Sequence, residues 1–141
     1  MATDIKKMMD DYKLAWNSHD VKKIISFFTD DGVYEDVATG KVSKGKKEIT
    51  DYLNSFFIDF PDLKLELKSL FAADDWGGSE IVSTATHAHS STPGIPTTGK
   101  VFSIRGATIF QLHKGKISRQ SEYYDQVSFL KQVGLMPGQP K

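Results

Sequence analysis

The period of the apolar residues changes at Pro61, and this change constrains the fold more than any other feature of the sequence. Before Pro61, apolar side chains recur three or four residues apart, as in amphipathic helices. After Pro61, apolar and polar side chains alternate, as in strands with one buried face. Helices followed by strands predict an α+β fold, in which N-terminal helices pack on one face of a curved, mostly antiparallel sheet. We expect such a sheet to leave a conical cavity beside the helices.

Three helices are predicted before Pro61. The first carries an apolar stripe made of Ile5, Met8, Met9, Tyr12 and Trp16 and ends in the polar run 17–20. Asp20 is a suitable N-cap for a second helix, whose buried edge includes Ile24 and Phe28 and which ends near residues 30–32. A short strand at 33–37 then precedes a third helix, which runs from about Lys46 until Pro61 stops it.

Four strands and one short helix are predicted after Pro61. The strands span about residues 63–69, 80–89, 100–112 and 116–124, with a turn at 74–78 and a tight hairpin at 113–115. The final helix covers 126–133, and Gly134 is placed to cap its C-terminus. The length of 141 residues, with no repeat or linker, favours one domain over residues 1–141.

Composition limits the partners of this chain. Eighteen basic and eighteen acidic residues cancel, so we expect a small molecule, and no nucleic acid, as the partner. The absence of cysteine excludes disulfides, thiol nucleophiles and thiolate metal sites. The apolar runs are too short to span a bilayer, and residues 1–4 lack the basic and apolar regions of a secretory signal. We therefore expect a cytoplasmic protein with no membrane partner.

His87 and Asp125 are the strongest candidates for proton transfer. His87 comes late on a predicted strand, and Asp125 follows the last strand in an aromatic setting. An imidazole and a carboxyl group in one apolar cavity can move protons, because burial shifts the pKa of the carboxyl toward neutral pH. Two structural alternatives stay open: Asp125 as the N-cap of the last helix, and His87 bonded to backbone at a strand end.

The same strand carries a second histidine at a spacing that some metal sites use. His89 lies two residues after His87 and therefore on the same face, as in metal-binding His-x-His pairs. Residues 90–93 bring no carboxylate at close spacing. We therefore expect no metal.

Short fragments along nearly the whole chain resemble the SnoaL-like polyketide cyclase (ester cyclase) family. They occur in the order and spacing of the family: Phe60-Pro61-Asp62, Thr86-His87, Gly94-Ile95-Pro96, Thr98-Gly99-Lys100, Gly115-Lys116-Ile117, Asp125 and Gln132-Val133-Gly134. The order of helices and strands is also similar to the cystatin-like α+β barrel shared by nuclear transport factor two and the steroid isomerases. The resemblance implies this cone-shaped fold and a homodimer formed through the outer face of the sheet.

The resemblance also implies a reaction. It is intramolecular aldol ring closure on a small hydrophobic or aromatic carbonyl compound, with no metal or organic cofactor. In the family an aspartate ten residues after the hairpin glycine is the general acid/base, and Gly115 and Asp125 have this spacing. A histidine in the position of His87 lines the pocket.

Tyr12 and Asp36 resemble a second branch of the same fold, the steroid delta-isomerases. In that branch a helix tyrosine polarises the substrate carbonyl, and an aspartate on the first strand moves the proton. The branch adds a protonated acid where this chain has Thr108, and half an oxyanion site stabilises an enolate less well. A delta-isomerase-like proton shuttle is therefore the alternative activity. A non-catalytic module that binds a hydrophobic ligand or dimerises is the alternative outside the enzymes.

Several further side chains are expected to contact the ligand. The predicted substrate-binding residues are Tyr12, Trp16, Tyr34, Thr108, Gln111 and Tyr123. The aromatic ones suit a flat ligand, and Gln111 stands where the family often has a basic or imidazole group. The pattern leaves open which face of the strand at 100–112 lines the pocket.

Overall fold

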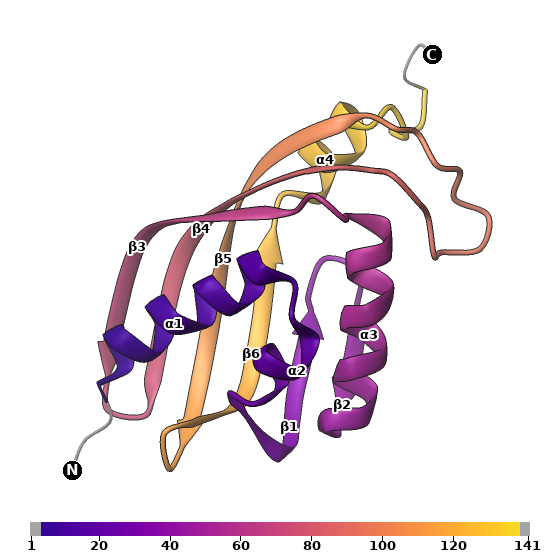
Figure 1. Cartoon of the computed structure of the whole chain (residues 1–141). Helices are drawn as coiled ribbons and strands as arrows, with labels where there is room; N and C mark the ends of the chain where they lie inside the picture. Colours follow the sequence, from indigo (N-terminus) through magenta and orange to yellow (C-terminus); the bar gives the residue numbers. More distant parts are fainter. Residues whose placement is uncertain (1–3, 139–141) are drawn as a thin grey trace.

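The computed structural model describes residues 4–138, which form four helices and six strands (Figure 1). The helices are α1 (Ile5–Ser18), α2 (Val21–Ile25), α3 (Gly45–Asp59) and α4 (Gln126–Gln132). The strands are β1 (Phe28–Asp36), β2 (Lys41–Lys44), β3 (Lys64–Ala73), β4 (Trp76–Thr86), β5 (Val101–His113) and β6 (Lys116–Tyr124).

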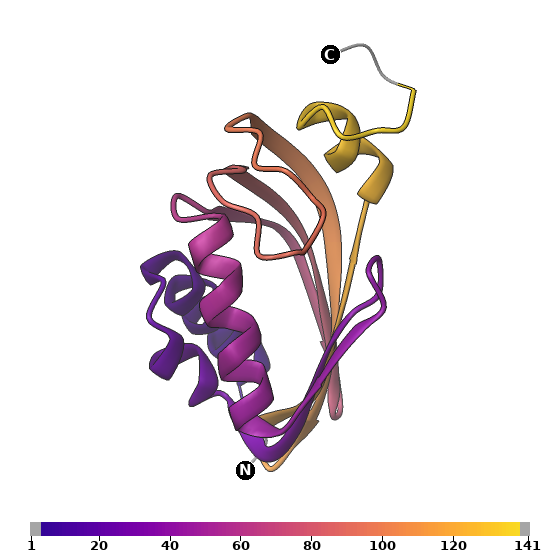
Figure 2. The same cartoon turned by 90° about the vertical axis from the view of Figure 1, so that its right-hand side faces the viewer.

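The strands form one six-stranded sheet in the order β2-β1-β6-β5-β4-β3. Neighbouring strands are antiparallel except β1 and β6, which are parallel. Figure 2 shows the sheet curving beside α1, α2 and α3, which all lie on its concave side, while α4 follows the upper end of β6. The predicted α+β fold, with helices on one face of a curved sheet, is confirmed.

Most element boundaries agree with the sequence pattern, and the differences come from strand pairing. Asp20 caps α2 by accepting a hydrogen bond from a backbone N–H (3.2 Å). The helix ends at Ile25, earlier than predicted, and Phe28 belongs to β1 because its backbone pairs with Ile117 of β6. Strand β2 was not predicted and pairs with β1. Strand β4 already begins at Trp76, so the predicted turn is shorter.

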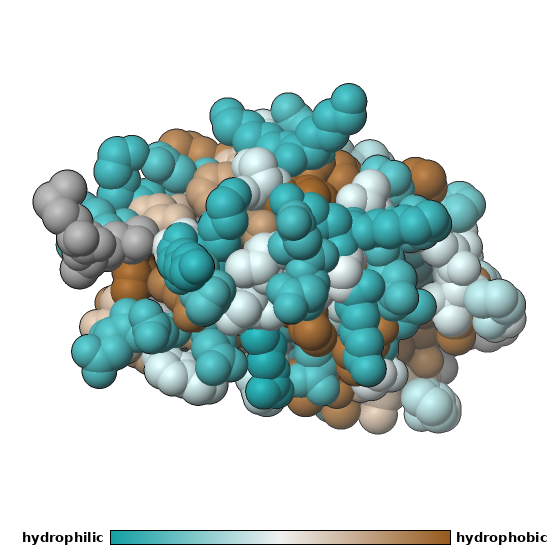
Figure 3. All heavy atoms as spheres, turned by 90° about the horizontal axis from the view of Figure 1, so that it is seen from below, coloured by the Kyte–Doolittle hydropathy of each residue, from teal (hydrophilic) through white to brown (hydrophobic). Residues whose placement is uncertain are grey.

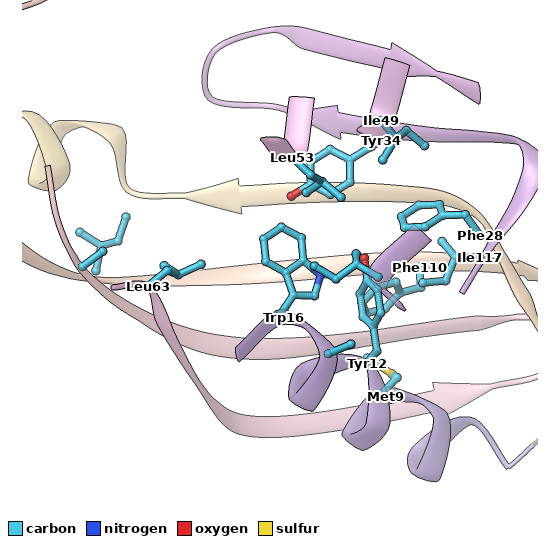
Figure 4. Close-up of a cluster of buried hydrophobic side chains, with 14 of the residues drawn as sticks. Met9, Tyr12, Trp16, Phe28, Tyr34, Ile49, Leu53, Leu63, Phe110 and Ile117 are labelled. Atoms are coloured by element: carbon cyan, nitrogen blue, oxygen red, sulfur yellow. The ribbon is translucent and has the colours of Figure 1, made fainter. Parts of the chain in front are cut away.

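The core lies between α1, α3 and the concave face of the sheet. Figure 4 shows Met9, Tyr12 and Trp16 of α1 pointing toward the sheet, with Leu53 of α3 and Tyr34 of β1 across from them. All five are buried. The helical spacing of the α1 residues therefore places them on one face, which is the face that packs.

A β-bulge in β6 decides which of its residues face inward. The pairs on the two sides of the bulge are Gln111 with Arg119 and Leu112 with Ile117, so Ser118 has no counterpart on β5. One extra residue shifts the alternation of side chains by one. Ile117 is buried before the bulge, and the residues that line the concave side after it are the even-numbered ones from 120 onward.

Asn17, near the end of α1, binds the edge of the sheet. Strand β3 is an edge strand, and its backbone has groups that no second strand can pair. The Asn17 side chain accepts from Leu65 N (2.7 Å) and donates to Leu65 O (3.0 Å). One amide side chain therefore satisfies both backbone groups and ties α1 to β3.

The surface at the lower end of the molecule is largely hydrophilic, with hydrophobic residues in small groups between the polar ones (Figure 3). A helix that spans a membrane needs about 20 apolar residues. Within residues 4–138, no helix is long and apolar enough to do so.

Asn17→Ala should lower the free energy of unfolding by about 1–3 kcal/mol, because the N–H and C=O groups of Leu65 lose their partner. Urea unfolding at one pH measures the difference. Asn54→Ala on the exposed side of α3 is the matched control and should change stability by less than about 0.5 kcal/mol. Equal effects of the two substitutions would contradict this role of Asn17.

Candidate active site

A cavity of about 1170 Å³ lies between the helices and the concave face of the sheet. Six polar side chains in its wall are buried: Asp36, Ser43, Ser79, His87, Thr108 and Gln120. Aromatic side chains supply much of the remaining wall, among them Trp16, Tyr34, Tyr52, Phe56, Phe60 and Phe102. Pockets for drug-sized ligands typically measure about 300–1,000 Å³, so this cavity has room for a ligand with several rings.

The register of the strands places four polar side chains in one row across the cavity wall. Asp36 of β1 is level with Glu122 of β6, and Glu122 is level with Thr108 of β5. Thr108 is in turn level with Ser79 of β4. Side chains in register on one face of a sheet lie about 5 Å apart. Two carboxyl groups therefore stand side by side in the cavity.

Asp36 is held by donors on both of its oxygens. The hydroxyls of Tyr52 (3.2 Å) and Tyr124 (3.1 Å) donate to Oδ2, and the backbone N–H of Thr39 (3.2 Å) donates to Oδ1. A carboxylate accepts hydrogen bonds and donates none. All three partners therefore donate to the carboxyl oxygens of Asp36.

Glu122 is the carboxyl group whose acidity the cavity changes. Its pKa is raised to about 7, first because burial disfavours the charged form and also because Asp36 is near. Hydrogen bonds to Oε1 from Gln120 Nε2 (2.6 Å) and Thr108 Oγ1 (3.1 Å) oppose the rise. Near neutral pH, Glu122 therefore exists in both forms, as a general acid/base requires.

Gln120 connects Glu122 to α1. This glutamine is 1% exposed, and its Oε1 accepts a hydrogen bond of 2.6 Å from the hydroxyl of Tyr12. Tyr12 was predicted to polarise a substrate carbonyl. In the structure its hydroxyl proton is already donated to Gln120.

The phenols around the two carboxyl groups stay protonated. Burial raises the pKa of four tyrosines: Tyr12, Tyr34, Tyr52 and Tyr124. The nearby carboxyl charges raise it further. The hydroxyl of Tyr34 interacts with Glu122 and lowers the pKa of that carboxyl. Tyr34 is therefore a hydrogen-bond donor beside the acid/base candidate.

His87 lies in another part of the cavity wall, just after the end of β4. It is 4% exposed, and its Nδ1 lies 3.0 Å from Thr98 Oγ1. The rings of Phe60 and Phe129 flank the imidazole. Burial lowers the pKa of His87, although Asp59 partly opposes this. A neutral imidazole carries one N–H, which suits it to bind a polar group of a ligand.

The structure brings six predicted site residues to the cavity. They are Tyr12, Trp16, Tyr34, Asp36, His87 and Thr108. The even-numbered residues of β5, such as Thr108, face the cavity, which settles the face that the pattern left open.

Three predicted site residues lie outside the cavity. Asp125 is exposed, and its Oδ1 accepts from Ser128 N (2.9 Å), so it caps α4 as the structural alternative proposed. The expected pairing of Asp125 with His87 in the cavity is therefore wrong. Tyr123 is 45% exposed, and Gln111 has the opposite parity to Thr108 on β5, so both belong to the outer face of the sheet.

Glu122 was missed by the sequence analysis. The signal was the alternation of Gln120, Glu122 and Tyr124, which gives β6 a polar inner face. If the alternation is counted from the apolar Ile117, the odd-numbered residues of β6 are predicted to face inward instead. The bulge at Ser118 reverses that count.

Metal ligands are not grouped in the described part of the chain. Within residues 4–138, no three side chains of His, Asp or Glu lie together as a metal ion requires. His89 binds Asp59 instead (Nδ1 to Oδ1, 3.0 Å), while His87 contacts Thr98. The two histidines therefore have separate partners.

Solved structures with a similar fold come from several bacteria. AclR from Streptomyces galilaeus, a hydroxylase candidate, is 26% identical over 96% of this chain and 88% of its own, with a TM-score of 0.79. A SnoaL-like polyketide cyclase candidate from Jannaschia is 14% identical over 94% and 92%, with a TM-score of 0.81. A protein with a ketosteroid isomerase-like fold from Catenulispora acidiphila is 22% identical over 95% of both chains, with a TM-score of 0.78. The last two have low sequence identity to this chain, so their similarity shows a common fold.

The sequence itself matches a family model. No curated protein matches this chain. The model of the SnoaL-like polyketide cyclases matches residues 6–133, which run from the first turn of α1 to the end of α4. The chain therefore belongs to the SnoaL-like polyketide cyclase family.

Proposed function

We propose that the protein is an acid–base cyclase that closes a ring in a carbonyl compound, with Glu122 as the general acid/base. The observation that carries this proposal is a carboxyl group with a pKa of about 7 in the wall of a large, mostly apolar cavity. A group of this kind both takes and returns protons near neutral pH. Membership of the cyclase family supports the reaction class.

The reaction is an intramolecular aldol addition. The Glu122 carboxylate removes a proton from the carbon next to a carbonyl group, which leaves an enolate. The enolate carbon forms a bond to a second carbonyl carbon of the same molecule, whose oxygen becomes an alkoxide. Glu122 returns the proton to that oxygen, so the product is an isomer of the substrate and Glu122 is restored.

Other cavity residues serve binding and stabilisation. The Tyr34 hydroxyl interacts with the Glu122 carboxylate. Once Glu122 has taken the proton and lost its charge, this hydroxyl donates to the enolate oxygen, which is a large contribution in enolate chemistry. Asp36 holds the hydroxyls of Tyr52 and Tyr124. His87 binds a polar group of a hydrophobic or aromatic ligand in its own part of the cavity.

The delta-isomerase alternative has weaker support in this chain. It needs the Tyr12 hydroxyl as the donor to the substrate carbonyl, and that hydroxyl is bound to Gln120 at 2.6 Å. Thr108, which stands where that branch has a protonated acid, donates to Glu122. A non-catalytic ligand-binding protein would not need a carboxyl with a pKa near 7. Glu122 therefore favours the enzyme.

Glu122→Gln should lower kcat by roughly 10²–10⁴-fold, because the amide cannot exchange protons. Ring closure is followed by liquid chromatography, which separates the cyclic isomer from its open-chain substrate, with polyketide esters that carry a CH₂ between two carbonyls. Asp125→Asn is the matched control, since asparagine also caps helices well. We expect it to keep activity. A folded Glu122→Gln protein that closes rings at the normal rate would end the assignment, and loss of activity in Asp125→Asn alone would move it to Asp125.

The pH dependence of stability tests the pKa of Glu122 without any substrate. The folded protein keeps this proton until about pH 7, whereas an unfolded chain releases it near pH 4.3. The folded state therefore binds more protons between these values, and its stability falls as pH rises through them. Relative to Glu122→Gln, we expect the wild type to lose on the order of 2–3 kcal/mol between pH 4.5 and 7.5. If urea unfolding gave the same pH dependence of stability for the wild type and for Glu122→Gln, this result would contradict the raised pKa.

We further propose that two copies of the chain associate through the outer face of the sheet. Uncharged residues occupy the middle of this face, among them Val82, Ala107, Ile109 and Ser121. Charged pairs flank them, Glu35 with Arg119 and Glu80 with Arg105. In a twofold dimer each copy presents the same patch, so acidic groups of one copy can face basic groups of the other.

Ile109→Lys should convert the dimer to a monomer, because a lysine would be buried without a partner in the middle of the interface. Sedimentation velocity measures the oligomeric state. Asn54→Lys on the exposed side of α3 is the control and should leave the wild-type state unchanged. A wild-type protein that is monomeric at high concentration would refute the proposal.

A further inference from the structure

The hydrogen bonds around Gln120 all run in one direction, toward Glu122. Tyr12 donates to Gln120 Oε1 (2.6 Å), and Gln120 Nε2 donates to Glu122 Oε1 (2.6 Å). Both bonds are short, and Gln120 is 1% exposed. The amide is therefore fixed in a buried position between a helix residue and the acid/base candidate.

Tyr12 fixes the orientation of the amide. The Tyr12 ring is buried among aromatic side chains, which include Trp16, Phe27, Phe28 and Phe110. The indole N–H of Trp16 can only donate, and its interaction with the Tyr12 hydroxyl lowers the pKa of Tyr12, as a donor does. Trp16 therefore cannot accept the Tyr12 proton. In the structure the Tyr12 proton goes to the amide oxygen of Gln120. A rotated amide would place its NH₂ group against this hydroxyl and its oxygen against Glu122.

Two of the donors to Glu122 reach the same oxygen, and the Tyr34 hydroxyl is a third donor beside this carboxyl. Gln120 Nε2 and Thr108 Oγ1 both donate to Oε1. A proton on Oε1 would point at the NH₂ group of Gln120, which has no lone pair to accept it. A proton on Oε1 would also require the Thr108 hydroxyl to turn and accept it. Neutral Glu122 therefore keeps both of these hydrogen bonds when its proton is on Oε2.

We propose that Gln120, oriented by Tyr12, is a positioning residue that confines the exchangeable proton of Glu122 to Oε2, the oxygen left for a molecule in the cavity. The inference rests on the proposed function, in which Glu122 is the acid/base. Gln120 and Tyr12 touch no reacting atom in this scheme. They determine which oxygen of Glu122 reacts and how readily it gives up its proton.

The test removes the amide without changing the size of the side chain much. Gln120→Met should raise the pKa of Glu122 by about one unit, because a hydrogen bond to its charged form is lost. It should lower kcat roughly 10- to 100-fold, since a misdirected proton slows transfer, and leave KM nearly unchanged. A carbon-13 NMR titration of the glutamate carboxyls gives the pKa, with the Glu122 signal assigned by its loss in Glu122→Gln. Gln111→Met on the outer face is the matched control and should change neither value.

A double variant separates positioning from folding. Gln120→Met leaves the buried Tyr12 hydroxyl without its acceptor, so the single variant will be less stable. Tyr12→Phe combined with Gln120→Met removes both polar groups and should recover most of the stability, whereas kcat stays low and the pKa of Glu122 stays high.

The outcomes distinguish the two proposals. A stable double variant with the wild-type kcat and the wild-type pKa of Glu122 would overturn the positioning role. A fully active Glu122→Gln protein would instead overturn the proposed function. The NMR titration would still show in that case whether Gln120 controls the acidity of Glu122.

Discussion

The burial of the Glu122 carboxyl in the cavity wall is the constraint on which the rest of the site depends. A carboxyl group taken out of water needs hydrogen-bond donors, and Thr108 and Gln120 supply them on one oxygen. Gln120 is itself buried and therefore needs Tyr12 of α1. The same burial raises the pKa of Glu122 to about 7. Burial of this carboxyl is thus the reason both for its hydrogen bonds and for the acidity on which the proposed function rests.

The parallel pairing of β1 with β6 gives this carboxyl its neighbour. The two strands are separated by most of the chain, yet their register places Asp36 level with Glu122. Asp36 keeps its charge partnered through Tyr52, Tyr124 and a backbone N–H. Its presence disfavours a second negative charge on Glu122. The proposed acid/base role therefore belongs to Glu122, whose pKa is raised by burial and by the nearby Asp36. Asp36 holds the hydroxyls of Tyr52 and Tyr124.

The architecture was predictable because its signals are local. The helical stripe on α1 and the cap of α2 involve residues a few positions apart, and each was found as expected. Asp125 caps α4, which was the structural alternative to its predicted catalytic role. The errors lie where distant strands decide the backbone. Phe28 follows a helical pattern but pairs with Ile117, and β2 exists because β1 lies beside it. Local patterns do not contain these partners.

The candidate site also has features that the sequence predicts and features that depend on the pairing of distant strands. Periodicity and family resemblance predicted the four helices, five of the six strands in residues 4–138, and six of the residues that line the cavity. They placed the acid/base at Asp125, three residues beyond Glu122. Only the folded sheet shows which of Glu122 and Asp125 faces the cavity. The extra residue at Ser118 turns Glu122 inward and Tyr123 outward. Strand β6 ends before Asp125, which caps α4. A bulge is a mismatch between two paired strands, so it appears only once both strands are in place.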